Sequence, residues 1–329
     1  MKASKTLILW LITLCISACT RTDHPRAFYY WKSRVKIDTV EHRYFQALEA
    51  KKLYIRLFDV DNETGLPLPL GMIQGFDATQ LKTEYIPVVF ITNRCFENST
   101  LTNNQQLAGK VNGLIRQICD SNKISPVKEI QIDCDWTLST RAAYFAFLKA
   151  LKKQSGKRLS CTVRLHQLRY FEKTGVPPVD RAVIMCYATT NPDEISTGNS
   201  ILDVELLKKY CSRIDSYPLP FDLALPLYSW AVVSNHMGKY KLINGLTRKD
   251  LEQNKDLEPM ADGTFRTRSD MVLNGLFLNK DFRVRAEEIN PATIQQAVRY
   301  FQENVHNQYS IIYYHLDGKF LNRFPIQTL

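Results

Sequence analysis

Several patterns that indicate common classes of function are missing from the sequence. No glycine-rich phosphate turn follows any strand-like run, which disfavours an open nucleotide-binding sheet. The eight cysteines form no Cys-x-x-Cys pair and show no metal-ligand spacing with histidine, so we expect neither a metal nor a cofactor. Lysine and arginine never form a run longer than a pair, and there is no internal repeat. We therefore interpret the formal charge of +10 as a solvated surface, and we expect no nucleic-acid partner.

Long apolar runs are also absent, apart from one at the N-terminus. Lys2 and Lys5 flank the start of the run LILWLITLCI, and small residues lead from there to Cys19. This pattern resembles a bacterial lipoprotein signal, with a signal peptide at 1–18 and lipidation of Cys19. The run is short for a bilayer span, which favours a signal over an uncleaved anchor. We expect a membrane-anchored lipoprotein of the cell envelope, periplasmic or surface-facing, with a tether at 19–26.

The six cysteines outside the signal are scattered through the chain. Cys134, Cys161 and Cys186 lie in apolar, strand-like runs, where cysteine packs as a small hydrophobic residue. We expect buried free thiols at these three positions. A disulfide between Cys95 and Cys119 remains open, because the sequence alone does not reveal the pairing.

Strand-like and helical patterns alternate along most of the chain. Helical patterns are clearest at 40–52, 103–121, 139–154 and 290–305, with helix starts predicted at Ser139 and at Asn290. Such alternation favours parallel strands with helices outside, and eight strands fit an α/β fold of the (β/α)8 TIM-barrel type over 27–329. The alternative is an open doubly wound sheet. The strand-like runs are 27–32, 53–60, 85–92, 129–136, 159–165, 181–187, 221–230 and 310–317.

One segment, at about 234–288, interrupts this alternation. It is too long for a loop between the seventh strand and its helix, and it contains short strand-like pieces of its own. We therefore predict an insertion after strand seven. Because that strand ends at the C-terminal mouth of the barrel, the insertion would form one wall of a cleft there.

The fourth strand-like run, EIQIDCDWT, ends on two acids. Asp133 and Asp135 share one face, with Cα atoms about 6.5 Å apart, while Cys134 and Trp136 face the helices. Two carboxylates this close do not both ionise easily, so one pKa should rise, as in general acid–base sites. The alternative is a structural pair of acids held by Arg56 or another inner cation. The C-terminal end of a barrel strand favours a catalytic role for both acids.

Short motifs in four strands resemble those of glycoside hydrolase family 18, the chitinase family. IDCDWT is similar to the end of its fourth-strand motif D-x-x-D-x-D-x-E, with Asp133 and Asp135 kept. Ile130 takes the place of the first aspartate, and Thr137 stands where the catalytic glutamate should be. The other three similarities are IMCYA at 184–188, where Ala188 replaces an aspartate, LPLYSW at 225–230, and Tyr314 near the position of the floor tryptophan.

The sequence also resembles a group of uncharacterised bacterial barrel lipoproteins with F-D-V in the second strand and D-x-D in the fourth. This second resemblance implies a lineage but no activity.

The family resemblance implies a reaction that this chain is not equipped to perform in the usual way. In the family, the glutamate protonates the leaving oxygen, the substrate's own acetamido group attacks, and the neighbouring aspartate orients it. A threonine hydroxyl does not ionise in the useful range, so Thr137 cannot be the general acid. Another group would have to supply the proton. The possible donors are Asp135, Asp59, Asp317, His166 and His315.

Aromatic residues gather at the predicted strand ends, where sugar rings would stack on them. Those retained as substrate-binding residues are Tyr187, Tyr228, Trp230 and Tyr314, together with Asp59 and Asp317. Arg56 is also assigned to substrate binding. Together with Arg164, it would neutralise the acids or bind an anionic sugar. Three functions remain open: a glycoside hydrolase with altered catalytic residues, a glycan-binding pseudoenzyme, and a structural envelope lipoprotein. The expected partners are a glycan and, through the lipid anchor, a membrane.

Overall fold

A computed structural model describes residues 24–192 and 199–329 of the 329-residue chain. The signal peptide at 1–18, Cys19 and most of the tether lie outside the described residues, so these predictions remain predictions. In the two described ranges, no helix is long and apolar enough to cross a membrane.

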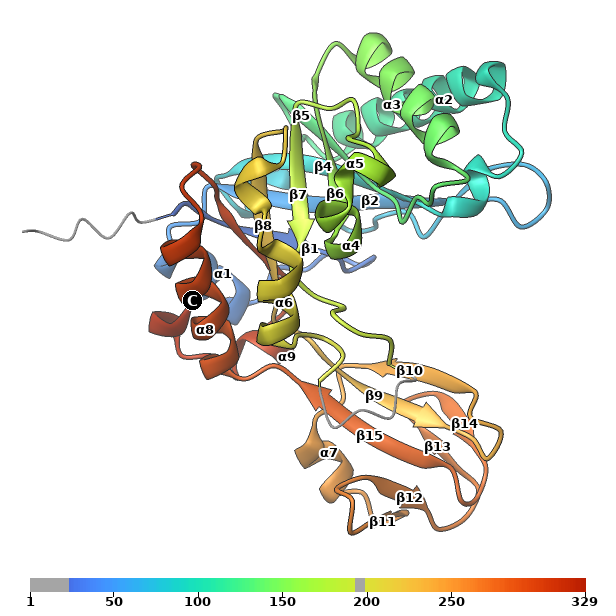
Figure 1. Ribbon diagram of the computed structural model, residues 1–329, viewed down its shortest axis with the longest axis vertical. Coiled ribbons are helices and arrows are strands. Elements are labelled where there is room, and N and C mark those ends of the chain that lie inside the picture. Colours follow the sequence, from blue (N-terminus) through green and yellow to red (C-terminus); the bar gives the residue numbers. More distant parts are fainter. Residues whose placement is uncertain (1–23, 193–198) are drawn as a thin grey trace, which may run out of the picture.

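Eight parallel strands close into a barrel, which confirms the predicted (β/α)8 fold (Figure 1). Their order is β1-β16-β8-β7-β6-β5-β4-β2, and β2 pairs with β1 to complete the circle. A short strand, β3 (Leu68–Leu70), pairs antiparallel with the end of β2. The barrel strands are β1 (Arg26–Tyr30), β2 (Lys52–Asp61), β4 (Glu84–Ile91), β5 (Glu129–Asp133), β6 (Arg158–Arg164), β7 (Arg181–Met185), β8 (Phe221–Pro226) and β16 (Ile311–Tyr314).

Helices surround the barrel, and local sequence explains where several of them begin. Asn290 caps α8 by accepting a hydrogen bond from the backbone of Thr293, and Pro291 occupies the tolerated first turn, as predicted. The third helix begins at Arg141, two residues after the predicted start at Ser139, with Thr140 as its N-cap. The helices are α1 (Thr39–Ala47), α2 (Leu101–Ser121), α3 (Arg141–Ser155), α4 (Leu165–Arg169), α5 (Phe171–Thr174), α6 (Val204–Cys211), α8 (Pro291–Asn304) and α9 (Gly318–Leu321). Single 3-10 turns lie at η1 (Ala78–Gln80), η2 (Asn93–Phe96), η3 (Ile214–Ser216) and η4 (Ile326–Thr328).

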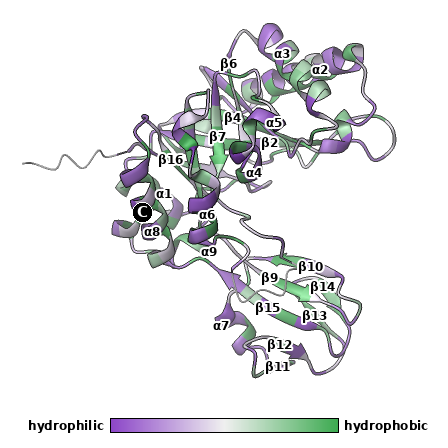
Figure 2. Ribbon diagram, viewed as in Figure 1, coloured by the Kyte–Doolittle hydropathy of each residue, from purple (hydrophilic) through white to green (hydrophobic). Residues whose placement is uncertain are grey.

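The segment that follows β5 packs its outward residues against α3, as the alternation of residues in the predicted strand 129–136 indicated. Cys134 and Trp136 are buried, and the Trp136 ring lies 5.2 Å from that of Phe145 on α3. Figure 2 shows apolar residues concentrated in the barrel strands, with hydrophilic residues on the outer helices. All six cysteines of the described ranges are buried free thiols, so Cys95 and Cys119 are not joined.

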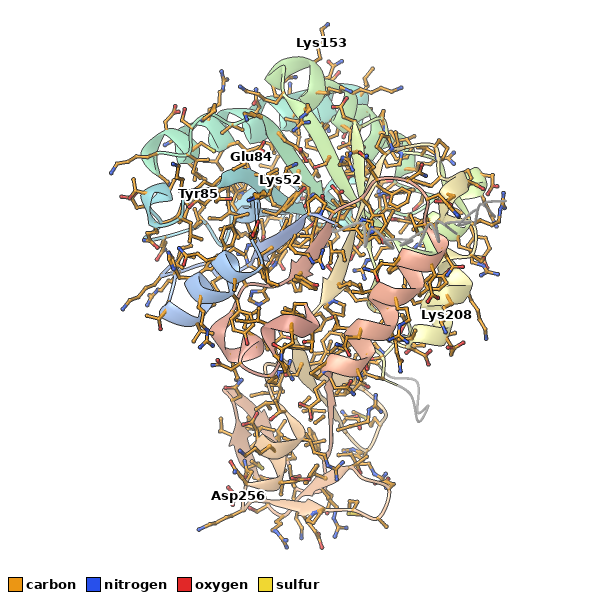
Figure 3. The ribbon with its side chains drawn as sticks, turned by 90° about the vertical axis from the view of Figure 1, so that its left-hand side faces the viewer. Lys52, Glu84, Tyr85, Lys153, Lys208 and Asp256 are labelled. Carbon is orange, nitrogen blue, oxygen red and sulfur yellow. The ribbon has the colours of Figure 1, made fainter. Side chains whose placement is uncertain are left out.

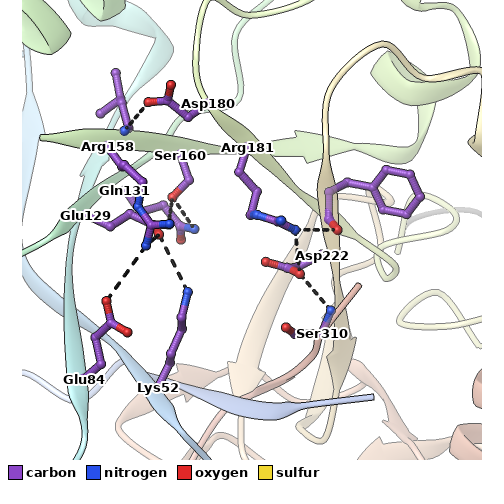
Figure 4. A network of polar contacts seen from close by, with 12 residues as sticks. Lys52, Glu84, Glu129, Gln131, Arg158, Ser160, Asp180, Arg181, Asp222 and Ser310 are labelled. Atoms are coloured by element: carbon purple, nitrogen blue, oxygen red, sulfur yellow. Dashed lines mark hydrogen bonds and ion pairs between the residues drawn. The ribbon is translucent and has the colours of Figure 1, made fainter. Parts of the chain in front are cut away.

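Ion pairs lie around the N-terminal ends of the barrel strands, opposite the mouth (Figure 4). The buried Glu129 carboxylate accepts a hydrogen bond from Ser160 at 2.7 Å and lies 3.7 Å from the Lys52 ammonium and 3.4 Å from Arg158. Asp222, also buried, pairs with Arg181 at 3.0 Å. Buried carboxylates require such partners, so we assign this network a role in stabilising the barrel.

Between β8 and α8 the chain forms a second, antiparallel sheet that projects from the barrel (Figures 1 and 3). The strand order is β10-β9-β15-β12-β11, with a separate β13–β14 hairpin and its own apolar core. The sheet starts at Ser229, ahead of the segment 234–288 singled out in the sequence. Its elements are β9 (Ser229–Ser234), β10 (Tyr240–Asn244), α7 (Arg248–Glu252), β11 (Leu257–Pro259), β12 (Phe265–Thr267), β13 (Met271–Leu273), β14 (Leu276–Leu278) and β15 (Arg283–Glu288).

The end of the seventh predicted strand was therefore wrong. The run 221–230 was expected to be a single strand, but β8 ends at Pro226 and Trp230 belongs to β9. Leu227 donates the last backbone hydrogen bond of the barrel ladder to the Tyr314 carbonyl at 2.7 Å, and the chain then leaves the barrel. The apolar run continues unbroken because both strands are buried, so hydropathy alone does not mark the change of sheet.

Candidate functional site

A cleft of about 1050 Å³ opens at the C-terminal ends of the barrel strands, where barrel enzymes place their chemistry. The second sheet contributes one wall through Trp230, Tyr240, Leu242 and Asn244. The structure brings all nine residues assigned to catalysis or substrate binding to this one cleft; that they act on a ligand stays a prediction. These residues are Arg56, Asp59, Asp133, Asp135, Tyr187, Tyr228, Trp230, Tyr314 and Asp317.

Asp133 lies at the floor of the cleft, at the end of β5, and is 7% exposed. The Thr162 hydroxyl donates a hydrogen bond to its Oδ1 at 2.7 Å. The pKa of Asp133 is raised to about 6, mainly by burial and to a smaller extent by the negative charge of Asp135. The expected rise in one carboxyl pKa is therefore present, but its larger cause is loss of solvent rather than the paired acid.

Asp135 forms a two-point ion pair with Arg164, which lies at the end of the adjacent strand β6. The Arg164 Nε donates to Oδ1 at 2.5 Å, and Nη2 donates to Oδ2. The alternative of an acid held by an inner cation therefore applies to Asp135, with Arg164 as the cation. Arg56 instead pairs with Asp59, its Nε lying 3.0 Å from Oδ1.

Thr137 does not line the cleft. It borders a side pocket of about 270 Å³, whose lining also includes Asp135, Arg164 and His166. Its hydroxyl lies 2.9 Å from that of Ser139, and its carbonyl accepts the backbone hydrogen bond of Arg141 at the start of α3. Thr137 therefore serves the turn that leads into α3.

The other proposed proton donors differ in their surroundings. Burial raises the pKa of Asp59, against the opposing effect of Arg56, and Asp317 lies 3.4 Å from the Lys32 ammonium. His315 lines the cleft, and burial lowers its pKa to about 4. Burial also lowers the pKa of His166, which lies in the side pocket. Both imidazoles are thus neutral at pH 7, so neither is available as a cationic proton donor. Among the carboxyl groups, Asp133 at the floor of the cleft is the most easily protonated, because its pKa is raised to about 6.

Aromatic rings form a continuous cluster around the cleft, with Tyr314 at its centre. The Tyr314 ring lies 5.5 Å from Trp31, 5.6 Å from Tyr187 and 5.7 Å from Tyr228. Trp230 extends the cluster, 5.2 Å from Tyr228. Tilted rings at these separations make favourable edge-to-face contacts, which fix their positions. Tyr187 and Tyr228 are buried within this cluster, whereas Trp31, Trp230 and Tyr314 are only half-buried and provide apolar surface for a ligand.

Sequence reasoning missed several residues of the cleft. Trp31 lines the cleft but was not among the retained aromatics, although its spacing of two residues from the inward-facing Tyr29 would have identified it. Tyr240 and Leu242 carried no signal, because they come from the second sheet. In the described ranges, no group of three or more His, Cys, Asp or Glu side chains is placed to hold a metal ion.

The arrangement combines exposed aromatic faces, ion-paired acids and two guanidinium groups in an open cleft. Such a lining is suited to a ligand with alternating apolar and hydroxylated surfaces, because the rings supply apolar contact and the charged groups fix orientation through hydrogen bonds.

Comparison with known proteins places the fold among chitinase-like barrels. No protein-family model and no curated protein matches the chain. Among solved structures, the Bacillus cereus spore cortex-lytic enzyme SleL has a TM-score of 0.56 and 16% identity, over 92% of this chain and 75% of the other. The Chromobacterium violaceum chitinase has a TM-score of 0.53 and 11% identity, over 93% of this chain and 98% of the other. The Ostrinia furnacalis Group IV chitinase in complex with allosamidin has a TM-score of 0.54 and 11% identity, over 89% of this chain and 92% of the other.

At this identity the likeness shows a shared fold. The chain is a closed eight-stranded parallel barrel of the architecture found in these chitinases and in SleL.

Proposed function

We propose that the protein binds a glycan in the cleft, as a lipoprotein anchored at the cell envelope, and that it does not hydrolyse this glycan by the family 18 route. The aromatic cluster around Tyr314, facing acids that are already ion-paired, carries the proposal. Sugar rings present apolar C–H faces that stack on such side chains, while their hydroxyls reach the flanking charged groups.

The most suitable class of ligand is an oligosaccharide containing N-acetylglucosamine. The support comes from structures that share the fold: several are chitinases, and one was solved with a penta-N-acetylchitooligosaccharide. Because fold alone does not determine activity, the experiment must decide both the ligand and the chemistry.

The absence of family 18 hydrolysis rests on two residues. Thr137 occupies the position of the glutamate and faces a turn and a side pocket, and its hydroxyl cannot serve as an acid near neutral pH. Asp135, the matching third aspartate, is held by Arg164, so it is not free to orient a substrate acetamido group.

A second function is favoured by one observation, the raised pKa of Asp133 at the floor of the cleft. A protonated Asp133 would donate its proton to the glycosidic oxygen as the C–O bond breaks, while water adds to the anomeric carbon and releases one proton to solvent, from which Asp133 is protonated again. This is hydrolysis with a replaced acid. It predicts product formation that disappears in Asp133→Asn.

The anchoring and localisation are supported by the N-terminal sequence ending at Cys19. Metabolic labelling of the expressed chain with a radiolabelled fatty acid should mark the wild type and leave Cys19→Ser unlabelled. Equal labelling of both would remove the lipoprotein part of the proposal.

Calorimetric titration of the full-length protein in detergent with soluble N-acetylglucosamine oligomers tests the binding. We expect saturable binding that weakens about tenfold or more in Tyr314→Ala, as for an aromatic residue at the centre of an interface. The matched control is Tyr170→Ala, an exposed tyrosine that does not line the cleft.

Chromatography of the same mixtures after prolonged incubation separates the two functions. Unchanged oligomers with binding intact favour the glycan-binding protein, whereas shortened oligomers that depend on Asp133 favour the hydrolase. Lack of binding in the wild type would overturn both for this class of glycan.

A further inference from the structure

Trp230 is placed in the cleft wall by a residue that does not line the cleft. Its indole Nε1 donates a hydrogen bond to Oε2 of Glu287 at 2.9 Å. The two residues are direct cross-strand partners, Trp230 on β9 and Glu287 on β15. Such pairs have their Cβ atoms about 5 Å apart, which brings the carboxylate to the edge of the indole.

The Glu287 carboxylate is fixed on all sides. The Ser200 backbone N–H donates to Oε2 at 3.1 Å, and the Ser200 hydroxyl donates to the same oxygen. Arg285 donates to Oε1 from Nη2 at 2.6 Å and from Nε at 3.0 Å. The residue is 4% exposed, so its charge is withdrawn from solvent and offset by these donors.

This network joins the loop after β7 to the second sheet. Arg285 also donates to the carbonyl of Pro192 at 3.0 Å, and Asn199 donates to the carbonyl of Glu288 at 2.8 Å. The carboxylate that receives the indole N–H is therefore held by groups from two separate parts of the chain. It is a rigid acceptor rather than a mobile surface group.

A fixed acceptor matters because an indole ring rotates about two side-chain bonds. Its hydrogen-bond donor lies on one edge, so one bond to a fixed acceptor favours a single orientation of the ring plane. Trp230 lies 5.2 Å from Tyr228, at the end of the aromatic cluster. Rotation of the indole would remove its face from the cleft without affecting the rest of the cluster.

We propose that Glu287 is the positioning residue that holds the Trp230 ring as a glycan-stacking surface in the cleft, a role that rests on the proposed glycan binding. Glu287 itself is absent from the cleft lining, so it acts through Trp230 and not by contact with the ligand. The competing explanation is that Glu287 serves only to join the loop after β7 to the second sheet.

A double-mutant cycle in the full-length protein distinguishes these explanations. Glu287→Ala should weaken binding of N-acetylglucosamine oligomers about tenfold, and Glu287→Gln, which keeps an acceptor for the indole, should retain most of the affinity. In the Trp230→Phe background, which has no indole N–H, Glu287→Ala should cause little further loss. The matched control Glu288→Gln, whose carboxylate pairs with Arg323 instead, should bind like the wild type.

Two further readouts complete the test. The near-ultraviolet circular dichroism of the ligand-free protein should lose a tryptophan signal in Glu287→Ala and Trp230→Phe alike, and keep it in Glu287→Gln. Equal loss of affinity from Glu287→Ala in the wild-type and Trp230→Phe backgrounds would overturn the positioning role, as would an unchanged tryptophan spectrum. If the wild type binds no oligomer, the proposed function fails, while the spectra still decide whether Glu287 orients Trp230.

Discussion

Arg164 neutralises Asp135 by a two-point ion pair across adjacent barrel strands, at the boundary between the main cleft and the side pocket that contains Thr137. A bidentate guanidinium–carboxylate pair fixes the geometry of both groups. The Asp135 carboxylate is therefore not free, and the ion pair lies between the main cleft and the side pocket that Thr137 lines.

Replacing Arg164 with methionine should release this acid. We expect Arg164→Met to lower the free energy of unfolding by about 1–2 kcal/mol, because the pair is partly exposed and only part of its attraction contributes. Denaturant unfolding measures the change. Arg164→Lys keeps the charge but loses the two-point geometry, so it should fall between the wild type and Arg164→Met. A methionine variant as stable as the wild type would contradict a stabilising pair.

The raised pKa of Asp133 predicts a pH-dependent stability. Protonated Asp133 is favoured in the folded protein, so the folded state binds more protons than the unfolded one between about pH 4 and pH 6. Its contribution is fully present below about pH 4 and is lost as the pH rises through about 6. A rise of the pKa from about 4 to about 6 corresponds to about 3 kcal/mol.

Comparison of the wild type with Asp133→Asn isolates the contribution of Asp133 protonation to stability. The asparagine variant still accepts the Thr162 hydrogen bond but does not titrate, so its stability relative to the wild type should increase from pH 4 to pH 7. Urea unfolding at several pH values provides the measurement. A constant difference across this range would show that the Asp133 pKa is not raised.

The charge network at the N-terminal ends of the barrel strands should matter for stability alone. Glu129→Ala leaves the Lys52 ammonium and the Arg158 guanidinium without their shared carboxylate, and should lower the free energy of unfolding by about 3 kcal/mol. Glycan affinity should not change, because Glu129 lies at the opposite end of β5 from the cleft. Thermal unfolding and calorimetric titration measure the two effects separately.

Introducing a glutamate at position 137, where the sequence resemblance aligns the catalytic acid of glycoside hydrolase family 18, should not by itself produce hydrolysis. In Thr137→Glu the new carboxyl enters the turn before α3 and the side pocket, on the far side of the Arg164–Asp135 pair from the cleft. Release of chromophore from an aryl glycoside of N-acetylglucosamine measures the activity. Turnover by Thr137→Glu alone would show that this position does reach the bound sugar.

The barrel was predictable because its signals are local. Each strand–helix unit buries an apolar strand and presents an amphipathic helix, so the alternation in the sequence indicates the architecture. The start of α8 was predictable for the same reason. The Asn290 side chain accepts a hydrogen bond from the backbone of Thr293, and Pro291 occupies the first turn of the helix. Asp133 was recognised because polar residues that end a buried strand of a barrel reach the C-terminal mouth.

The sheet to which Trp230 belongs was not predictable in the same way. The run 221–230 is apolar apart from Asp222 and Ser229, but its last residues pair with β10 and β15 rather than with the barrel. Hydrophobicity indicates that a segment is buried, but it does not indicate which strand the segment pairs with. The boundary of β8 therefore depended in part on pairing with β15, which lies tens of residues away.

The sequence by itself determined the class of fold and the end of the barrel at which the candidate residues gather. These depend on residue type and on periods of two to four residues. Only the tertiary structure decided that Arg164 holds Asp135, 29 residues away, and that Glu287 holds Trp230, 57 residues away. Both contacts cross between strands, so they follow from strand order and register, which emerge when the whole chain packs.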